Sequence, residues 1–318
     1  MPKVILPMFL LICVAASLRG SAPLSPVDAF VVSHGYGGAQ FVRAENTYRL
    51  PINVNGKVGD LTIDTGASTS VVFTPSAKKF GLQATLTSER VHGAFGKGKE
   101  KVGIASIQRL TMGNLTLMNV KVAVLSDWFS GGLYRPYGAS DGLFGLREML
   151  RYGAVLDLPS HLILVHPGGP MENISDDIRS ILTKEGYTPV PLKVVDGHLQ
   201  VSAVLNGTAC KLVVDTGAYF TAIHRPFARR AKIGGYDVGL NAQGLGTGGR
   251  GVGYSHFPEL KLGNFAIHNV SVTVSDLDPA IAGDIPDFAG LLGADYLGLC
   301  GAVFDFNNPT VYLRPKKG

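Results

Sequence analysis

Short apolar runs, separated by glycine-rich turns, recur along most of this 318-residue chain. Beyond the N-terminal segment, β-branched and aromatic residues alternate with polar ones, and turn signals return about every ten residues, as in half-buried strands. Asn55-Gly56 is a pair that two-residue hairpin turns favour. One stretch differs: we expect a helix from Ser175, as its N-cap, through Lys184, with Gly186 at its end. The pattern therefore predicts a mostly β protein with short helices.

The same features occur twice, in the same order. An apolar run leads into Asp-Thr-Gly-Ala at residues 61–67 and again at 212–218. Every matched pair is separated by 148 to 151 residues, which indicates an internal duplication. The other matched pairs are residues 55–56 with 206–207, 75–79 with 226–230, 110–114 with 260–264, 142–145 with 290–293, and 154–157 with 302–305.

The duplication divides the chain into two pseudo-symmetric lobes. Lys3, the apolar run after it and a small-residue exit are typical of a secretory signal peptide, although an uncleaved N-terminal anchor is the alternative. Export to the periplasm or the extracellular space follows, with no stable membrane insertion once the signal is removed. The expected organisation is a signal peptide at 1–22, a loosely structured lead-in or pro-segment at 23–38, a first lobe at 39–167, a linker with the helix at 168–187, and a second lobe at 188–318.

Composition narrows the class of function. Hydrophobic residues make up 46% of the chain and charged residues 17%, which suits a sizeable core and argues against disorder. The formal charge of +5 falls to +3 once Lys3 and Arg19 leave with the signal, and no dense basic block follows, so we expect no nucleic-acid partner. The histidines show no metal-ligand spacing, so no metal or other cofactor is expected. Cys210 and Cys300 either pair or are buried thiols.

The two Asp-Thr-Gly turns carry the candidate chemistry. Brought face to face, Asp64 and Asp215 could not both ionise cheaply, so the pair would share one proton over a broad pH range. The ionised member could take a proton from a water molecule while the protonated member donates to a carbonyl oxygen, which is general acid–base hydrolysis without a metal or a covalent intermediate. Hydroxyls that bond across the lobe junction and glycines that let the backbone pass beneath the carboxylates would support the pair: Thr65, Thr216, Gly66 and Gly217.

Each Asp-Thr-Gly-Ala turn is followed by a glycine-rich hairpin and then by an apolar-apolar-Gly segment. In this the chain resembles the retropepsin-like aspartic proteases, and its two lobes in one chain make it similar to the pepsin-type enzymes. The resemblance implies a bilobed acid-protease fold of two pseudo-symmetric β lobes, a peptide or protein substrate, and a monomer that is an internal pseudo-dimer. It makes Asp64 and Asp215 the catalytic dyad. It also implies substrate contacts from two flaps and from pocket loops at 128–140 and 277–287, with Phe95, Gly96, Trp128, Phe144, Phe220, Gly246, Thr247 and Leu292 as candidates.

The lobes are not equivalent everywhere. Arg147 stands where Asp295 stands in the second lobe, and we interpret Asp295 as a helix N-cap. Ser68-Thr69 follows the first turn and Tyr219-Phe220 the second, so the bulky pair is expected to narrow one pocket. At the equivalent strand ends, Asp157 and Asp305 are interpreted as turn formers.

Neither turn carries a hydroxyl after its glycine, because Ala67 and Ala218 stand there. Without a hydroxyl to bond the carboxylates, their pKa values should be less depressed than serine or threonine would make them, which predicts a mildly acidic optimum. The sequence as a whole predicts an exported aspartic endopeptidase. A non-catalytic peptide- or protein-binding scaffold with the same fold is the alternative, and a precursor inactive until residues 23–38 are removed is a third possibility.

Overall fold

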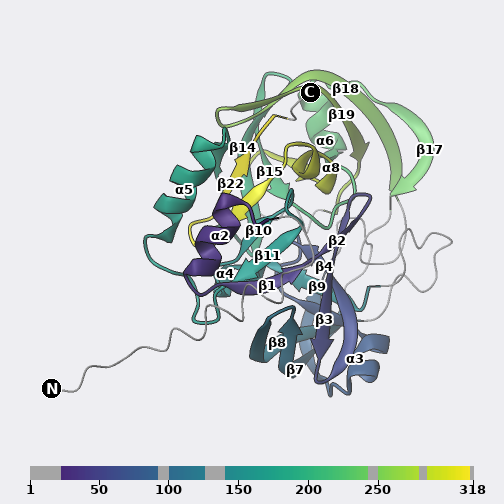
Figure 1. Cartoon of the computed structure of the whole chain (residues 1–318). Helices are drawn as coiled ribbons and strands as arrows, with labels where there is room; N and C mark the ends of the chain where they lie inside the picture. Colours follow the sequence, from purple (N-terminus) through teal and green to yellow (C-terminus); the bar gives the residue numbers. More distant parts are fainter. Residues whose placement is uncertain (1–22, 92–99, 126–139, 243–249, 279–284, 316–318) are drawn as a thin grey trace.

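The computed structural model describes residues 23–91, 100–125, 140–242, 250–278 and 285–315, which form three β-sheets with short helices around them (Figure 1). Two eight-stranded sheets each form the body of a lobe, and a six-stranded sheet joins the lobes. Strands dominate, and the same sheet order occurs twice. The prediction of a mostly β, bilobed and duplicated fold is therefore confirmed.

The sheet of the first lobe has the order β2-β3-β4-β9-β5-β8-β7-β6. β9 enters between β4 and β5 and runs parallel to β4, while β3 also pairs with β7, so that the sheet curls over its own core. Alternate residues of β3, beginning at Tyr48, are buried, as a period of two requires. The elements are β2 (Val42–Ala44), β3 (Thr47–Val54), β4 (Lys57–Asp64), β5 (Val71–Phe73), α3 (Thr74–Phe80), β6 (Thr85–Val91), β7 (Glu100–Met112), β8 (Leu115–Leu125), β9 (Gly142–Gly145) and α4 (Leu146–Arg151).

The second lobe repeats this plan with the order β13-β14-β15-β20-β16-β19-β18-β17. β20 is parallel to β15, and β14 also pairs with β18. Its elements are β13 (Lys193–Val195), β14 (His198–Leu205), β15 (Thr208–Val214), β16 (Ala222–His224), α6 (Arg225–Arg230), β17 (Tyr236–Ala242), β18 (Arg250–Leu262), β19 (Phe265–Ser275), β20 (Phe288–Leu292) and α8 (Ala294–Leu299).

The joining sheet, which we call the central sheet, has the order β1-β11-β10-β21-β22-β12. At its middle β10 and β21 are antiparallel, and Leu156 lies opposite its own counterpart Phe304. The duplication is therefore visible as a pseudo-twofold relation at this pair. The strands are β1 (Gly37–Gln40), β10 (Val155–Asp157), β11 (Leu162–Val165), β12 (Thr188–Pro191), β21 (Val303–Asp305) and β22 (Thr310–Leu313).

The segment 23–38 is ordered structure, not the loosely structured lead-in that was predicted. Pro26–Ser33 forms helix α2, and β1 then pairs with β11 at the edge of the central sheet. Val27 and Val31 lie one turn apart and are buried against that sheet, and this burial orders the segment. β1 and β12 occupy the two edges of the sheet at an offset of 151 residues, so the repeat starts before residue 39.

Helix α5 (Ile174–Lys184) packs beside α2 over the same face of the central sheet (Figure 1). Its N-cap is Asn173, in the left-handed conformation, and the prediction of Ser175 as the cap is wrong. The Ser175 hydroxyl bonds instead to Asp305. Gly186 follows the helix with φ of 86°, as expected for a residue just past a helix end.

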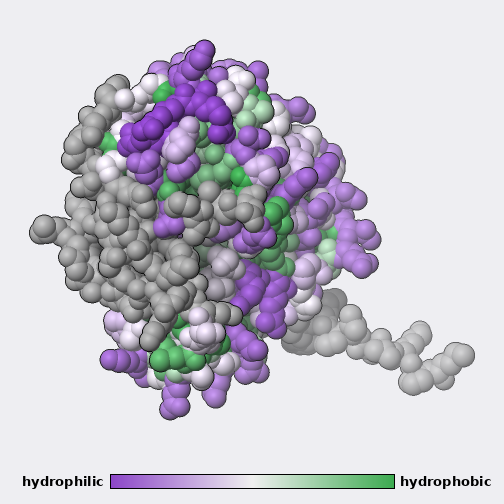
Figure 2. Space-filling view, turned by 180° about the vertical axis from the view of Figure 1, so that it is seen from behind, coloured by the Kyte–Doolittle hydropathy of each residue, from purple (hydrophilic) through white to green (hydrophobic). Residues whose placement is uncertain are grey.

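Cys210 and Cys300 are both free, buried thiols, so of the two open alternatives the structure shows the second. Burial raises the pKa of each thiol to about 12. In the face shown in Figure 2, hydrophilic residues cover much of the described surface, with smaller hydrophobic patches between them. No helix within the described ranges is long and apolar enough to cross a membrane. The predicted signal peptide at 1–22 lies outside the described residues.

Candidate functional site

The site lies where the two Asp-Thr-Gly turns meet between the lobes. Asp64 is the last residue of β4, and Asp215 directly follows β15. Each of these strands is held from the side by a parallel strand, β9 in the first lobe and β20 in the second. Near the turns, Ile63 of β4 and Val214 of β15 are fully buried, and the parallel neighbour pairs with the last residues of each strand, so both carboxylates follow from well-held strand ends.

Thr65 and Thr216 lock the two turns together. The Thr65 amide donates to Thr216 Oγ1 at 3.0 Å, and the Thr216 amide donates to Thr65 Oγ1 at 3.0 Å. Each hydroxyl in turn donates across the junction, to the Val214 carbonyl at 2.8 Å and the Ile63 carbonyl at 2.9 Å. Both threonines are fully buried, so four hydrogen bonds in a dry setting fix the distance between the lobes.

Each carboxylate is oriented by the amides of its own turn. Asp64 Oδ1 accepts from the Gly66 and Ala67 amides at 2.9 and 3.0 Å. Asp215 Oδ1 accepts in the same way from the amides of residues 217 and 218, at 2.8 and 3.0 Å. These bonds turn the two carboxyl groups toward one another, and a hydrogen bond joins them.

The glycines of the two turns are required by close approach. A Cβ atom on Gly66 would lie 2.4 Å from Cγ of Asp215, and one on Gly217 would lie 2.4 Å from Cγ of Asp64. Real Cβ atoms do not approach other heavy atoms so closely, so each glycine makes room for the acid of the opposite lobe. The predicted role of these glycines, to let the backbone pass beneath the carboxylates, matches this geometry.

Burial raises the pKa of both aspartates. For Asp64 the charge of Asp215 and the hydrogen bond between the carboxyls raise the pKa further, well above its ordinary value. For Asp215 the hydrogen bond from Asp64 and those from the turn amides work against burial. The two groups are strongly coupled, so the pair holds one proton over a pH range in which two separate aspartates would both be ionised. Both residues keep part of their surface open to solvent, so water can reach the pair.

A further layer of hydrogen bonds supports each turn. In the second lobe Asp295 Oδ1 accepts from the Thr221 amide at 2.9 Å and from its hydroxyl at 2.7 Å. The N-cap of α8 is Gly293, so the interpretation of Asp295 as the cap is wrong. In the first lobe Glu148 takes the same part, accepting from the Ser70 amide at 2.8 Å. The carboxylate missing at Arg147 is thus supplied by the next residue, and Arg147 forms an ion pair with it at 2.8 Å.

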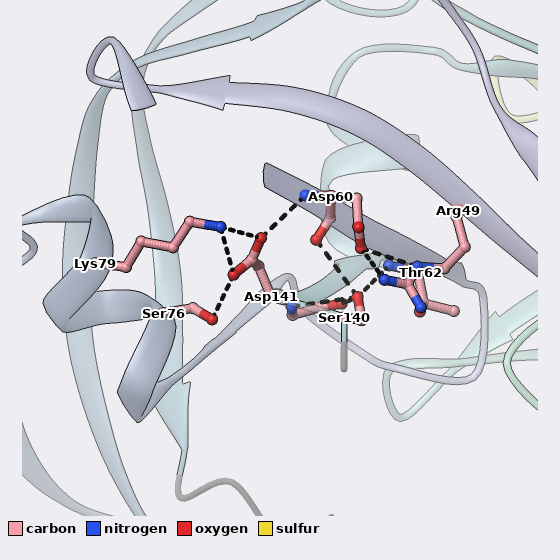
Figure 3. A network of polar contacts seen from close by, with 8 residues as sticks. Arg49, Asp60, Thr62, Ser76, Lys79, Ser140 and Asp141 are labelled. Carbon is pink, nitrogen blue, oxygen red and sulfur yellow. Dashed lines mark hydrogen bonds and ion pairs between the residues drawn. The ribbon is translucent and has the colours of Figure 1, made fainter. Parts of the chain in front are cut away.

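A polar network braces β4 in the first lobe (Figure 3). Asp141 accepts from the Asp60 amide at 3.1 Å, from Ser76 Oγ at 2.7 Å and from Lys79 Nζ at 2.8 Å. Partial burial raises the pKa of Asp141, but these hydrogen bonds outweigh it and hold that pKa below its usual value. Ser140 Oγ accepts from the Thr62 amide at 3.0 Å, so the network ends two residues before the candidate acid.

The turns also touch the opposite lobe's first hairpin. Asn46, between β2 and β3, donates to the Tyr219 carbonyl at 3.0 Å, and the Tyr219 hydroxyl donates to Glu45. Reciprocally, Gly197, between β13 and β14, lies so near Ser68 that an added Cβ would be 3.1 Å from that side chain. The bulky second turn is therefore braced by polar groups and the small first turn by a glycine. These contacts were not predicted, although counting residues in the repeat places residues 45–46 opposite 196–197.

The predicted substrate contacts divide into three groups. Phe144 and Leu292 lie in the hydrophobic core with 0% and 1% exposure, so their prediction as substrate contacts is wrong: they are the buried residues of β9 and β20 that pack beneath the turns. Phe220 is 53% exposed and stacks edge-on against Tyr219. The remaining candidates lie outside the described residues: Phe95, Gly96, Trp128, Gly246 and Thr247.

Asp157 and Asp305 form turns, as interpreted. Asp157 accepts from the Ser160 amide at 2.8 Å and Asp305 from the Asn307 amide at 2.9 Å. Within the described ranges no group of three or more His, Cys, Asp or Glu side chains is arranged to hold a metal ion.

The chain was compared with known protein families, with curated proteins and with solved structures. The family model described as aspartyl protease matches the chain twice, at residues 50–147 and 201–296, and each match contains one Asp-Thr-Gly turn. No curated protein matches the chain. Among solved structures, a retropepsin-like aspartic protease from Rickettsia conorii is similar at 19% identity over 41% of this chain and 90% of its own, with a TM-score of 0.31.

Proposed function

Because the chain belongs to the aspartyl protease family, we propose that it is an endopeptidase in which Asp64 and Asp215 activate a water molecule between them. The observation that carries the proposal is the reciprocal threonine arrangement, which holds two hydrogen-bonded carboxyl groups against each other. A pair of turn aspartates with a purely structural role would need neither the shared proton nor the glycines that admit the opposite acid.

In this proposal the two acids take different roles, because the pair holds one proton. Ionised Asp215 takes a proton from the attacking water, and protonated Asp64 donates its proton to the carbonyl oxygen of the peptide. The tetrahedral diol then breaks its C–N bond as the amine receives the proton held by Asp215, while one hydroxyl of the diol returns a proton to Asp64 and becomes the carbonyl of the acid product, so the pair again holds one proton. The mechanism uses no covalent intermediate.

The substrate is proposed to be an extended peptide that binds between the lobes by strand-like hydrogen bonds. The long hairpins β6–β7 and β17–β18 stand at the edges of the two lobe sheets, where such a peptide could be covered. Since both turns come from one chain, the site is complete in a monomer. Export of the enzyme, which rests on the predicted signal peptide, is part of the same proposal.

The test uses the purified protein and a mixed peptide library at pH 3 to 7. Cleavage should be found in wild type and should fall at least about a thousandfold in both Asp64→Asn and Asp215→Asn, because each change removes one partner of the acid–base pair. Asn can still accept the turn amide bonds, so the fold should survive, as checked by circular dichroism. Asp177→Asn, on the exposed side of α5, is the matched control and should cleave like wild type.

Two results would overturn the proposal. Cleavage that persists in both variants would place the reaction elsewhere. Binding of peptides without cleavage at any pH would instead support the non-catalytic scaffold.

A further inference from the structure

The hairpin before each Asp-Thr-Gly turn begins with a residue on the same face of the sheet as the candidate acid. In the first lobe the β3–β4 ladder ends with Arg49 opposite Thr62, and counting two residues further along each strand leads to Thr47 and Asp64. In the second lobe the β14–β15 ladder ends with Gln200 opposite Val213, and the same count leads to His198 and Asp215. Residues two apart on a strand share a face, so Thr47 and His198 hold corresponding places toward the acids of their lobes.

These two residues are chemically different. Thr47 is neutral, and its hydroxyl donates to the Ala44 carbonyl at 2.8 Å, within its own hairpin. His198 is an ionisable base whose Nδ1 is buried and has no hydrogen-bond partner among the described residues. An imidazole nitrogen left without a partner beside a carboxyl pair is free to respond to the charge of that pair.

The charged groups that act on His198 are Asp215, across the hairpin, and Asp196, in the turn before it. Burial lowers the pKa of His198, and these two carboxylates oppose the change without reversing it. Burial raises the pKa of Asp215, and the hydrogen bonds from Asp64 and the turn amides oppose that rise, as does, to a smaller extent, the charge of His198. The coupling is therefore present in acid, where the imidazole is protonated, and is lost as the pH rises and the imidazole becomes neutral.

We propose that His198 is a positioning residue: its imidazolium favours the ionised form of Asp215 and so keeps the shared proton on Asp64. This inference rests on the proposed function. It would also make the two sides of the site chemically different although their turns are alike, since neutral Thr47 stands at the corresponding place in the first lobe. The enzyme would then keep its base ionised further into the acid range than a symmetric pair would.

The first test is the pH profile of kcat/KM for peptide cleavage. In His198→Thr, which copies the first lobe, the acid limb should move up by roughly 0.5 to 1 pH unit, because ionised Asp215 has lost a nearby positive charge. His198→Gln, which keeps more of the side-chain volume, should shift the limb in the same direction. His268→Thr is the control for loss of a histidine, since His268 is exposed on β19 and pairs with Glu259. Its profile should match wild type.

The second test is independent of activity. The imidazole of His198, assigned by its absence from the His198→Thr spectrum, is titrated by NMR in wild type and in Asp215→Asn. Coupling is reciprocal, so its midpoint should fall by roughly 0.5 to 1 pH unit in Asp215→Asn, while that of His268 stays fixed.

The two failures are distinguishable. If wild type cleaves nothing, the proposed function fails, and the NMR titration still decides whether His198 and Asp215 are coupled. If cleavage occurs but neither histidine variant shifts the acid limb, or if the His198 titration ignores Asp215→Asn, the inference about His198 is overturned.

Discussion

The two lobes are alike at the turns and differ in what surrounds them. The threonine hydroxyls reach the opposite lobe at 2.8 and 2.9 Å, and the amides that orient the acids do so at 2.8 to 3.0 Å in both lobes. The carboxylate behind the turn, in contrast, comes from Glu148 in one lobe and from Asp295, at a different position of the repeat, in the other. Chemistry that needs both acids constrains the turns, while any side chain that satisfies the same hydrogen bonds can support them.

The lobes also differ in their outer braces. Asp141 joins α3 to β4 in the first lobe, whereas buried Ala289 stands at its place in the second. On the central sheet, Asp157 of the first lobe lies against a second carboxyl group, Asp28 of α2, whereas Asp305 of the second lobe is bonded by the Ser175 hydroxyl of α5. Beside the central sheet, the first-lobe side thus buries two acidic groups, Asp28 and Asp157, where the second-lobe side buries Asp305.

The largest expected effect concerns this second carboxyl pair. Burial and the neighbouring Asp157 raise the pKa of Asp28 to about 7, above its ordinary value of 3.8. The folded state therefore binds more protons than the unfolded state between these values, so stability is full below about pH 4 and falls as the pH rises toward 7. For the wild type this pH-dependent fall in unfolding free energy is on the order of 3 to 4 kcal/mol. In Asp28→Asn the amide can donate to Asp157 at any pH, so the fall should be absent.

Urea denaturation between pH 5 and 8 measures this difference. Wild type should lose stability across the interval, and Asp28→Asn should stay level and be the more stable protein at pH 8. Asp276→Asn removes an exposed carboxylate and should follow wild type. If the unfolding free energies of wild type and Asp28→Asn changed with pH in the same way, the Asp28–Asp157 pair would not destabilise the first lobe, and the prediction would be wrong.

The next effect tests the likeness of the turns. Thr65→Val leaves the buried Thr216 amide and Val214 carbonyl without partners, and Thr216→Val does the same to their counterparts, so each should lower the unfolding free energy by about 2 to 4 kcal/mol. Thr69→Val is the control and should be neutral, because the Thr69 hydroxyl is buried with no partner in the described structure. If only one of the two variants lost unfolding free energy, the two threonines would not contribute equally to stability.

The smallest expected effect comes from a substitution beside Asp215 alone. Ala218→Thr adds a hydroxyl that can donate to Asp215, which should lower the pKa of Asp215 and move the acid limb of kcat/KM down by about 0.3 to 0.5 pH unit. This change is opposite in sign to that expected for His198→Thr. An unchanged profile, or a wild-type optimum below about pH 3, would contradict the view that Ala67 and Ala218 leave the optimum mildly acidic.

Much of the fold follows from the sequence because the duplication supplies an internal check. Asp64 and Asp215 stand out since two weak three-residue motifs recur at a fixed offset, and Thr65 and Thr216 follow from hydrogen-bonding needs at the junction of two such turns.

The failures have physical causes. Helix α2 (Pro26–Ser33) is ordered by burial against the central sheet. The composition of residues 23–38 alone does not predict this contact, because the strands of the sheet are distant in sequence. Phe144 and Leu292 were placed at the substrate because their segments follow pocket loops, yet strand alternation turns them inward. The local sequence around Asp295 is typical of a helix N-cap. In the fold, however, its carboxylate accepts hydrogen bonds from the Thr221 amide and hydroxyl, which are distant in sequence.

The central sheet has a consequence for the molecule as a whole. Each half gives it three strands, and the bonds between β10 and β21 close the gap between them. A half-molecule made alone would leave one of these strands as a bare edge, a template for self-association. The chain is therefore a covalently tethered pair whose halves complete each other, and severing the connection between β11 and α5 would leave that ladder in place.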